Sequence, residues 1–146
     1  MIETALHIDT ARNAVAKGDL LMAQQQYAAA LAQYRDDYQT MFEFANLLFA
    51  TDRLDAAIAA AHRAVKLAPS SYQVWHNYGW YLGVAGRYEE AMMAFKQSLS
   101  LEPAYASFFA LGLCRYSIGK FEDAILDFTI DMDVRIVAFN GILLLR

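Results

Sequence analysis

The chain has 146 residues, a length that suits one modest domain. Hydrophobic residues make up 58% of it, above the roughly 45–50% of an average soluble domain, so the chain can bury a core. Its net charge of −4 argues against nucleic acid as a partner, because nucleic acid selects basic surfaces. The single cysteine, Cys114, excludes an intrachain disulfide and fits a reduced, cytoplasmic setting.

No segment of the sequence has the pattern of a membrane anchor or a secretory signal. The first nine residues lack a basic region followed by an apolar run. The longest stretch without charge, residues 67–86, contains Pro69, Ser70 and Asn77 and is too polar to cross a bilayer. We therefore expect no insertion into a membrane.

Residues of the same kind recur along the chain at intervals of 33 or 34 positions. A small residue repeats in this way at Ala23, Ala57, Ala91 and Ala124. A turn is marked at the same place in each copy by Gly18, Asp52, Gly86 and Gly119. Several positions in phase over four copies predict a repeat protein, in which each unit buries its apolar faces against its neighbours.

The best copy identifies the kind of repeat. Its signature positions are Trp75, Tyr78, Gly79, Leu82, Tyr88, Ala91, Phe95 and Pro103. With Tyr78 where Leu is usual and Leu82 where Tyr is usual, this segment resembles the tetratricopeptide repeat, a pair of helices about 34 residues long. The resemblance implies an all-α fold of helix-turn-helix repeats stacked as a right-handed superhelix, an α-solenoid.

In chain order, we expect a single domain over residues 1–146 that holds four repeats. The first, residues 4–37, is degenerate, with His7 in place of Trp and Arg35 in place of Pro; its Asp19 can cap the second helix. The remaining repeats cover residues 38–71, 72–104 and 105–137. In the last one, Arg115 replaces the usual aromatic residue.

Small residues are also predicted where the two helices of a repeat pack together. They are Ala11, Ala45, Gly79 and Gly112, one in the first helix of each pair. A side chain of this size lets the second helix approach closely.

Residues 138–146 are predicted to begin a further, partial capping helix. A capping helix normally has a polar outer face, whereas this segment is apolar around much of its circumference. Either the chain is a fragment, or a partner or a second copy covers the segment. The predicted interface residues are Phe139, Ile142, Leu143 and Leu145.

Candidate chemistry is sparse, so we predict neither an enzyme nor a cofactor. His7, His62 and His76 lie in different repeats, and no spacing supplies a second ligand, so we predict no metal site. Cys114 lies in an apolar stretch and is expected to be a buried thiol rather than a nucleophile.

The inner surface of such a fold is lined by the first helix of each repeat, and placing the repeats in register gives a candidate peptide-binding groove. Its predicted residues are Phe42, Asn46, Phe49, His76, Trp80, Phe109, Leu113 and Tyr116, with Ile8, Arg12, Ala50, Gly83, Val84 and Ser117 beside them. Trp80 stands where a small polar residue is usual, which favours a binding role. Phe49 and Tyr116 occupy positions that are often aromatic, so packing is an equal alternative for them.

Two family functions can be compared with these residues. Binding the acidic C-terminal peptide of heat-shock chaperones requires inward-facing cations, and here Phe42, Ala106 and Ala110 replace them, so we reject that function. Residues 107–125 and 132–141 resemble the small tetratricopeptide chaperones of type III secretion, which bind an apolar segment of a secreted protein.

We therefore predict a cytoplasmic protein–protein interaction module that binds an extended apolar peptide, and the second resemblance implies a secretion chaperone. The alternative is a scaffold or assembly subunit that self-associates through its apolar C-terminal end. The expected partner is a protein or peptide, or a second copy of the chain.

Overall fold

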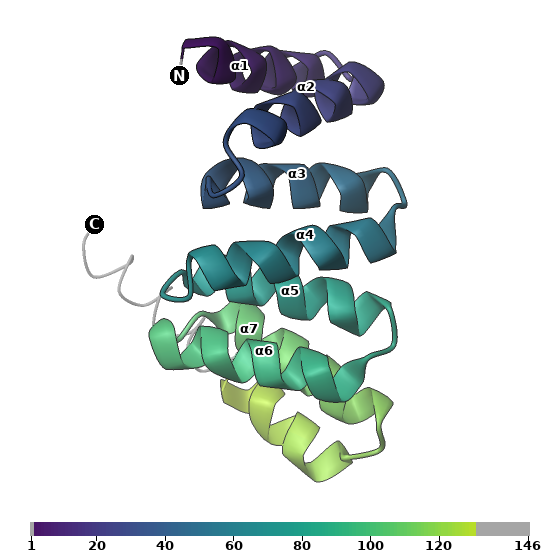
Figure 1. The fold of residues 1–146 in the computed structure, drawn as a ribbon. Helices are drawn as coiled ribbons and strands as arrows, with labels where there is room; N and C mark the ends of the chain where they lie inside the picture. Colours follow the sequence, from purple (N-terminus) through teal and green to yellow (C-terminus); the bar gives the residue numbers. More distant parts are fainter. Residues whose placement is uncertain (1, 131–146) are drawn as a thin grey trace, which may run out of the picture. The chain divides into compact units, whose positions relative to one another are not determined.

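The computed structural model describes residues 2–130, and within them every element of regular structure is a helix (Figure 1). The helices are α1 (Ile2–Ala16), α2 (Leu20–Gln33), α3 (Tyr38–Ala50), α4 (Leu54–Leu67), α5 (Tyr72–Val84), α6 (Tyr88–Leu101) and α7 (Tyr105–Ser117). Residues 121–130 are also helical. The predicted all-α fold of helix pairs is confirmed.

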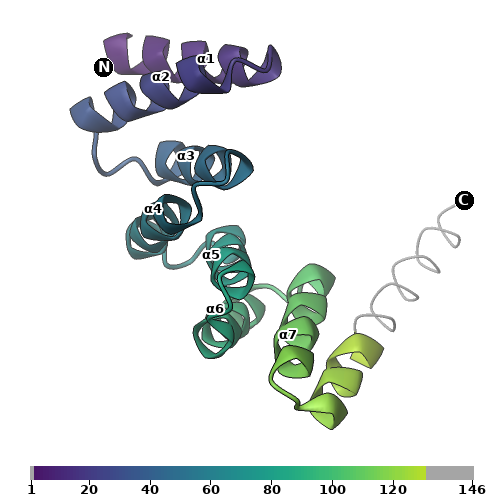
Figure 2. The same ribbon diagram turned by 90° about the vertical axis from the view of Figure 1, so that its right-hand side faces the viewer.

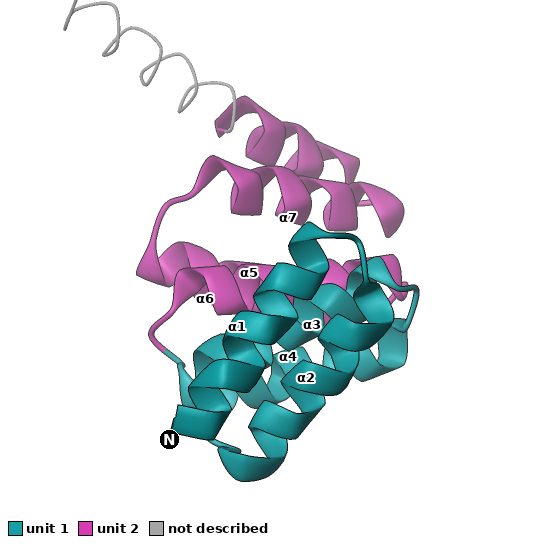
Figure 3. Cartoon of the chain, turned by 90° about the horizontal axis from the view of Figure 1, so that it is seen from above, with its two compact units in different colours: residues 1–69 teal, residues 70–146 magenta. Residues whose placement is uncertain are grey.

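The chain forms two compact units, Met1–Pro69 and Ser70–Arg146 (Figure 3). In the first unit α1 packs against α2, α2 against α3, and α3 against α4. In the second unit α5 packs against α6 and α6 against α7, and the turns between paired helices can be followed in Figure 2.

The turn inside each pair has a left-handed residue at the position that the repeat marks. The φ angles are +77° at Gly18, +59° at Asp52, +76° at Gly86 and +81° at Gly119. Glycine adopts this conformation without a steric cost, and Asp tolerates it better than most residues, which explains why the turn accepts Asp52.

The residue after each turn closes the preceding helix. The backbone N–H groups of Asp19, Arg53 and Arg87 each donate to a carbonyl five residues earlier at 2.9 Å, and that of Lys120 does so at 2.8 Å. This is the hydrogen bond of a Schellman motif, which satisfies carbonyls at the end of a helix. The Asp19 side chain then accepts from the Met22 N–H at 3.0 Å, so its predicted capping role is confirmed.

Small residues bring the helices of a pair together, as the sequence predicts. A Cβ atom added to Gly79 would lie 3.0 Å from two ring carbons of Phe95, and one added to Gly112 would lie 2.6 Å from a ring carbon of Phe128. In both pairs the aromatic residue follows the glycine by 16 positions. The ring of the second helix therefore occupies the space that a side chain on the first helix would need.

The repeated alanines are core residues, because Ala23, Ala57, Ala91 and Ala124 are all fully buried.

The departure from the repeat pattern at Arg115 has a structural reason. Its Nη1 donates to both carboxylate oxygens of Asp127 at 2.7 Å, and this carboxylate is almost fully buried. Burial raises the pKa of Asp127, and the guanidinium of Arg115 opposes the rise. An ion pair thus replaces the usual aromatic contact of the last repeat.

We expect Gly79→Ala to lower the free energy of unfolding by about 1–3 kcal/mol, because Phe95 is buried and cannot yield to the new methyl group. The matched control is Gly83→Ala on the same helix, where an added Cβ would lie 3.7 Å from Cys114 Sγ, an ordinary contact. The control is expected to be neutral or to stabilise by up to about 1 kcal/mol. Urea denaturation measures both, and equal effects would contradict the close approach at Gly79.

Candidate functional site

The second unit has an apolar pocket of about 270 Å³ formed by α5, α6 and α7. Its lining residues are Trp80, Gly83, Val84, Tyr88, Phe95, Ala110, Leu113, Cys114 and Ser117. Helix α5 supplies the first three residues, α6 the next two, and α7 the remaining four.

The pocket has an exposed apolar rim and a buried floor. Trp80 and Leu113 lie on the rim, with 40% and 38% of their surface exposed. Phe95, Ala110 and Cys114 are buried beneath them. An indole and a leucine side chain beside an apolar floor can bury a ligand's apolar side chain on several sides.

Gly83 contributes space to this pocket. It lies in the last turn of α5 and does not have a left-handed φ angle. A Cβ atom added to it would lie 3.7 Å from Cys114 Sγ, an ordinary contact distance. The glycine is therefore not required by the backbone or by close packing at this position. Its effect is to leave the floor of the pocket open between Trp80 and Leu113.

The Cys114 thiol belongs to the floor of the pocket rather than to a reactive centre. It is buried, and burial raises its pKa to about 11. At neutral pH it is therefore a neutral thiol, and the thiolate, which is the nucleophilic form, is scarce. This agrees with the sequence prediction of a buried small apolar residue.

His76 takes part in a buried polar chain that joins α5, α6 and α7. Its Nδ1 lies 2.8 Å from Ser107 Oγ, Ser107 Oγ lies 3.1 Å from Ser98 Oγ, and Ser98 donates to the Tyr72 carbonyl at 3.0 Å. Each hydroxyl has one proton to donate. Because Ser98 uses its proton on Tyr72, Ser107 must donate to Ser98, and the His76 Nδ1–H must donate to Ser107.

This chain fixes the imidazole by its Nδ1 side. Burial lowers the pKa of His76, because it disfavours the charged form of the ring. The ring also lies 5.5 Å from that of Phe95, measured between centroids. The structure thus gives the predicted groove residue His76 a packing role, with Nδ1 already in use.

The other predicted residues of the second unit fall into two groups. Trp80 and Leu113 line the pocket, as do the neighbouring positions Gly83, Val84 and Ser117. Phe109 packs against Phe128 with ring centroids 5.5 Å apart, and Tyr116 meets Phe121 edge-on at 5.2 Å. The lining residues Tyr88 and Phe95 were missed because only the first helix of each repeat was considered. The sequence feature that could have identified them is their apolar character at positions where α6 faces α5.

In the first unit, Phe42, Asn46 and Phe49 lie on α3 and are half-buried. A cleft of that unit is lined by other residues of α3, among them Met41, Phe44 and Leu48. The predicted interface residues Phe139, Ile142, Leu143 and Leu145 lie outside the described residues.

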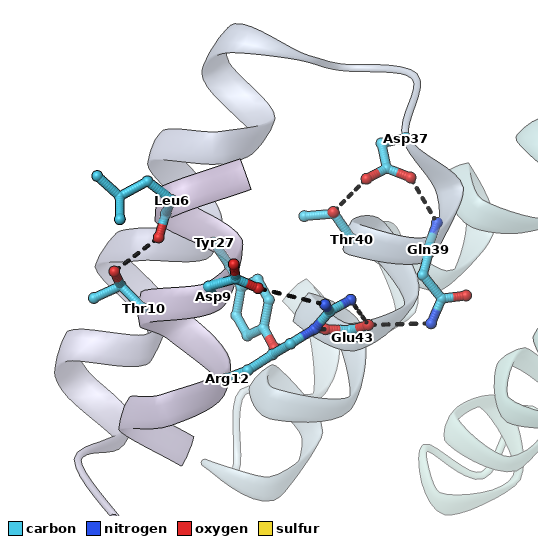
Figure 4. Close-up of polar contacts among 9 residues, drawn as sticks. All are labelled: Leu6, Asp9, Thr10, Arg12, Tyr27, Asp37, Gln39, Thr40 and Glu43. Atoms are coloured by element: carbon cyan, nitrogen blue, oxygen red, sulfur yellow. Dashed lines mark hydrogen bonds and ion pairs between the residues drawn. The ribbon is translucent and has the colours of Figure 1, made fainter. Parts of the chain in front are cut away.

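The carboxylate of Glu43 joins three helices of the first unit (Figure 4). Arg12 of α1 donates to it from Nε at 3.0 Å and from Nη2 at 2.8 Å, and Tyr27 of α2 donates at 2.9 Å. Gln39, one turn earlier on α3, donates at 3.1 Å. These hydrogen bonds, that of Arg12 first, hold the pKa of Glu43 below its usual range.

Within residues 2–130 no three His, Cys, Asp or Glu side chains gather in a way that could bind a metal ion. In the same part of the chain, no helix has the length and apolar character needed to span a membrane. What the described residues present is an apolar recess between helices, the kind of site that binds a protein segment.

Paired helices that stack in this way define a helical-repeat protein. The family model described as tetratricopeptide repeat matches residues 8–72, 42–99 and 76–129, so the chain belongs to the tetratricopeptide repeat family.

Two kinds of known protein resemble the chain. A segment of 79 residues, 53% of the chain, is 29% identical to the peroxisomal targeting signal receptor of Candida glabrata. The chain spans only 13% of that relative's length.

The fold is similar to that of MamA, as two of the solved structures illustrate. One has a TM-score of 0.90 at 16% identity and covers 94% of this chain and 81% of that one.

The second, MamA from Desulfovibrio magneticus RS-1, has a TM-score of 0.85 at 15% identity, with 90% of this chain and 75% of that one covered. Identities this low establish a common fold and nothing about shared partners.

The ion pair at Glu43 predicts a pH dependence of stability. A carboxyl whose pKa is lowered by folding stabilises the protein above its unfolded pKa, and this stabilisation disappears as pH falls through the folded pKa. We expect Glu43→Gln to destabilise the protein at about pH 7 and to unfold with a shallower dependence on pH between about 5 and 3. Thermal melts across this range give the pH dependence of the melting temperature for the wild type and for the variant. Equal slopes for the two proteins would contradict a lowered pKa of Glu43.

Proposed function

We propose that the pocket of the second unit binds an extended apolar segment of a partner protein. The observation that carries this proposal is the exposed pair of Trp80 and Leu113 above a buried apolar floor. A large aromatic side chain exposed at the rim of a pocket is the type of residue that dominates binding energy at protein interfaces.

The size of the pocket supports a peptide side chain as its occupant. Its volume of about 270 Å³ lies just below the range of about 300–1,000 Å³ that is usual for pockets holding an entire small ligand. It can accept one or two apolar side chains while the rest of the segment runs along the surface. The Ser117 hydroxyl already donates to the Leu113 carbonyl at 2.9 Å, so its proton is not available to a bound segment. Polar contacts must therefore join the backbone of the segment to other positions of this chain.

The predicted groove residues Phe42, Asn46 and Phe49 lie on α3 of the first unit, and peptide contact there is proposed separately from the pocket of the second unit. The Candida glabrata relative is by its name a receptor of a targeting signal, which supports recognition of a protein segment as the general activity.

The narrower proposal is a cytoplasmic chaperone of type III secretion that keeps an apolar client soluble. It rests on the sequence resemblance of residues 107–125 and 132–141 alone. The pocket is compatible with such a client, because an apolar segment that would otherwise aggregate can bury a side chain between Trp80 and Leu113.

A second candidate function is self-association through the C-terminal end of the repeats. The observation that favours it is the outer face of the helix formed by residues 121–130, where Phe121, Ile125 and Leu126 are 54%, 64% and 58% exposed. Three large apolar side chains on one helix form a patch that an interface would cover. The interface residues predicted from the sequence, Phe139, Ile142, Leu143 and Leu145, belong to the same proposal.

We expect Trp80→Ala to weaken the binding of apolar peptides by at least about tenfold, the equivalent of about 1.4 kcal/mol, because it removes the exposed anchor. The probes are short peptides selected from a random library by their binding to the wild-type chain. Fluorescence anisotropy of labelled peptides gives the affinities, and circular dichroism checks that the variant keeps its helices.

The matched control for this prediction is Tyr38→Ala. Tyr38, on α3, is 42% exposed, close to the 40% of Trp80, and it belongs neither to the predicted groove nor to the pocket lining. Unchanged affinity in Trp80→Ala, or an equal loss in both variants, would reject the pocket as the binding site.

The second candidate function predicts that the molar mass of the wild-type chain rises with concentration. Sedimentation velocity over a wide concentration range measures this directly. Leu143→Glu together with Leu145→Glu should reduce the association, because the charges would have to be buried at the interface. A monomer at every concentration would reject self-association.

A further inference from the structure

The first unit contains a cleft of about 610 Å³ that the proposed peptide site does not use. Its lining residues are Ala28, Leu31, Ala32, Arg35, Met41, Phe44, Leu48, Arg53, Ala56, Ala59, Ala60 and Arg63. Helix α3 supplies the apolar floor, and α2 and α4 supply the two walls.

The walls of this cleft are made of small side chains. Ala28 and Ala32 are one turn apart on α2, and Ala56, Ala59 and Ala60 follow one another along a face of α4. Alanine covers little of the helix backbone, so another helix can come close to both walls. The buried side chains of Leu31, Met41 and Leu48 lie deeper and keep the cleft apolar.

The rim of the cleft is positively charged. Arg35, Arg53 and Arg63 are its charged lining residues, and among the described residues no acidic side chain lines it. Among residues 2–130 none of the three forms an ion pair. Arg63 donates to the Arg35 carbonyl at 3.3 Å, and this hydrogen bond holds these two arginines near one end of the cleft. Arg53, the residue just before α4, lies ten positions earlier in the sequence, about 15 Å away along the helix axis.

This combination defines the chemistry of an occupant. An apolar floor with alanine walls suits the apolar face of a helix, and three guanidinium groups that form no ion pair among residues 2–130 suit carboxylates beside that face. The required segment is an acidic amphipathic helix with large apolar side chains.

The chain itself carries such a helix. In residues 121–130 the exposed apolar side chains are Phe121, Ile125 and Leu126, and the acidic residues Glu122 and Asp123 are exposed beside them. Phe121, Ile125 and Leu126 span the outward face of the helix, with Glu122 between Ile125 and Leu126 and Asp123 at the edge of that face.

We propose that the helix of residues 121–130 in one copy of the chain docks into the arginine-rimmed cleft of a second copy. Phe121, Ile125 and Leu126 enter the cleft, and Glu122 and Asp123 pair with arginines of its rim. The proposal rests on the self-association suggested above and names its acceptor surface. Because the two surfaces differ, the contact is head-to-tail, and each bound copy keeps a free cleft or a free helix for the next.

The test uses the full chain and two charge-reversed variants. The cleft variant carries Arg35→Glu and Arg63→Glu, and the helix variant carries Glu122→Lys and Asp123→Lys. We expect each variant alone to associate at least about tenfold more weakly than wild type, because like charges meet at the contact. An equimolar mixture should associate again, since one variant supplies an intact helix and the other an intact cleft. Sedimentation velocity measures all three samples.

The matched control is Lys66→Glu, which reverses a charge on the same helix α4 outside the cleft lining and should leave association unchanged. A wild-type chain that stays monomeric would reject self-association itself. Wild-type association that neither variant weakens, or a mixture that stays monomeric, would overturn the cleft as acceptor while leaving self-association standing.

A cross-link keeps the proposal testable if a charge-reversed variant fails to fold. Ala59→Cys in one sample and Ile125→Cys in another place thiols in the cleft and on the helix, at exposed positions. The native Cys114 is buried with a pKa raised to about 11, so the new thiols react first. A bismaleimide should join the two variants preferentially over either variant with itself. Equal yields in all three combinations would overturn the docking.

Discussion

The second unit depends on one contact, the packing of the Phe95 ring against the bare backbone at Gly79. This approach brings α5 and α6 together, and the same ring lies 5.5 Å from the imidazole of His76 and forms part of the pocket floor. A residue that belongs to the repeat signature therefore also shapes the candidate binding site. The pairing of Gly112 with Phe128 repeats the contact in the next helix pair, where the Arg115–Asp127 ion pair lies alongside it.

Once the two helices are fixed, the position of the pocket follows. Gly79 and Gly83 are one turn apart on α5, and they have opposite roles: the first is filled by an aromatic ring and the second is left open. Trp80 on α5 and Leu113 on α7 then form a rim above the open position. The buried chain from His76 through Ser107 to Ser98 ties the three helices together, so the rim is held by hydrogen bonds as well as by apolar packing.

The sequence was sufficient for the fold because its signals are local and repeated. The turn residues Gly18, Asp52, Gly86 and Gly119 have the left-handed backbone that their positions suggest, and the repeated alanines are buried. The site was only partly predictable. Trp80 and Leu113 could be placed by register, whereas the contribution of α6 and the polar partner of His76 depend on side-chain packing between helices. The arginine-rimmed cleft was missed for a similar reason, since its residues come from three helices and follow no repeat period.

The central claim is that an apolar segment binds over Gly83, between Trp80 and Leu113. The most direct measurement is the perturbation of backbone amide NMR signals when a selected apolar peptide is added to the isotope-labelled chain. The account predicts that the largest changes occur at Gly83, Leu113 and Ser117 and at the indole N–H of Trp80. Changes confined to α2 and α4, with the signals of these four residues unmoved, would contradict it.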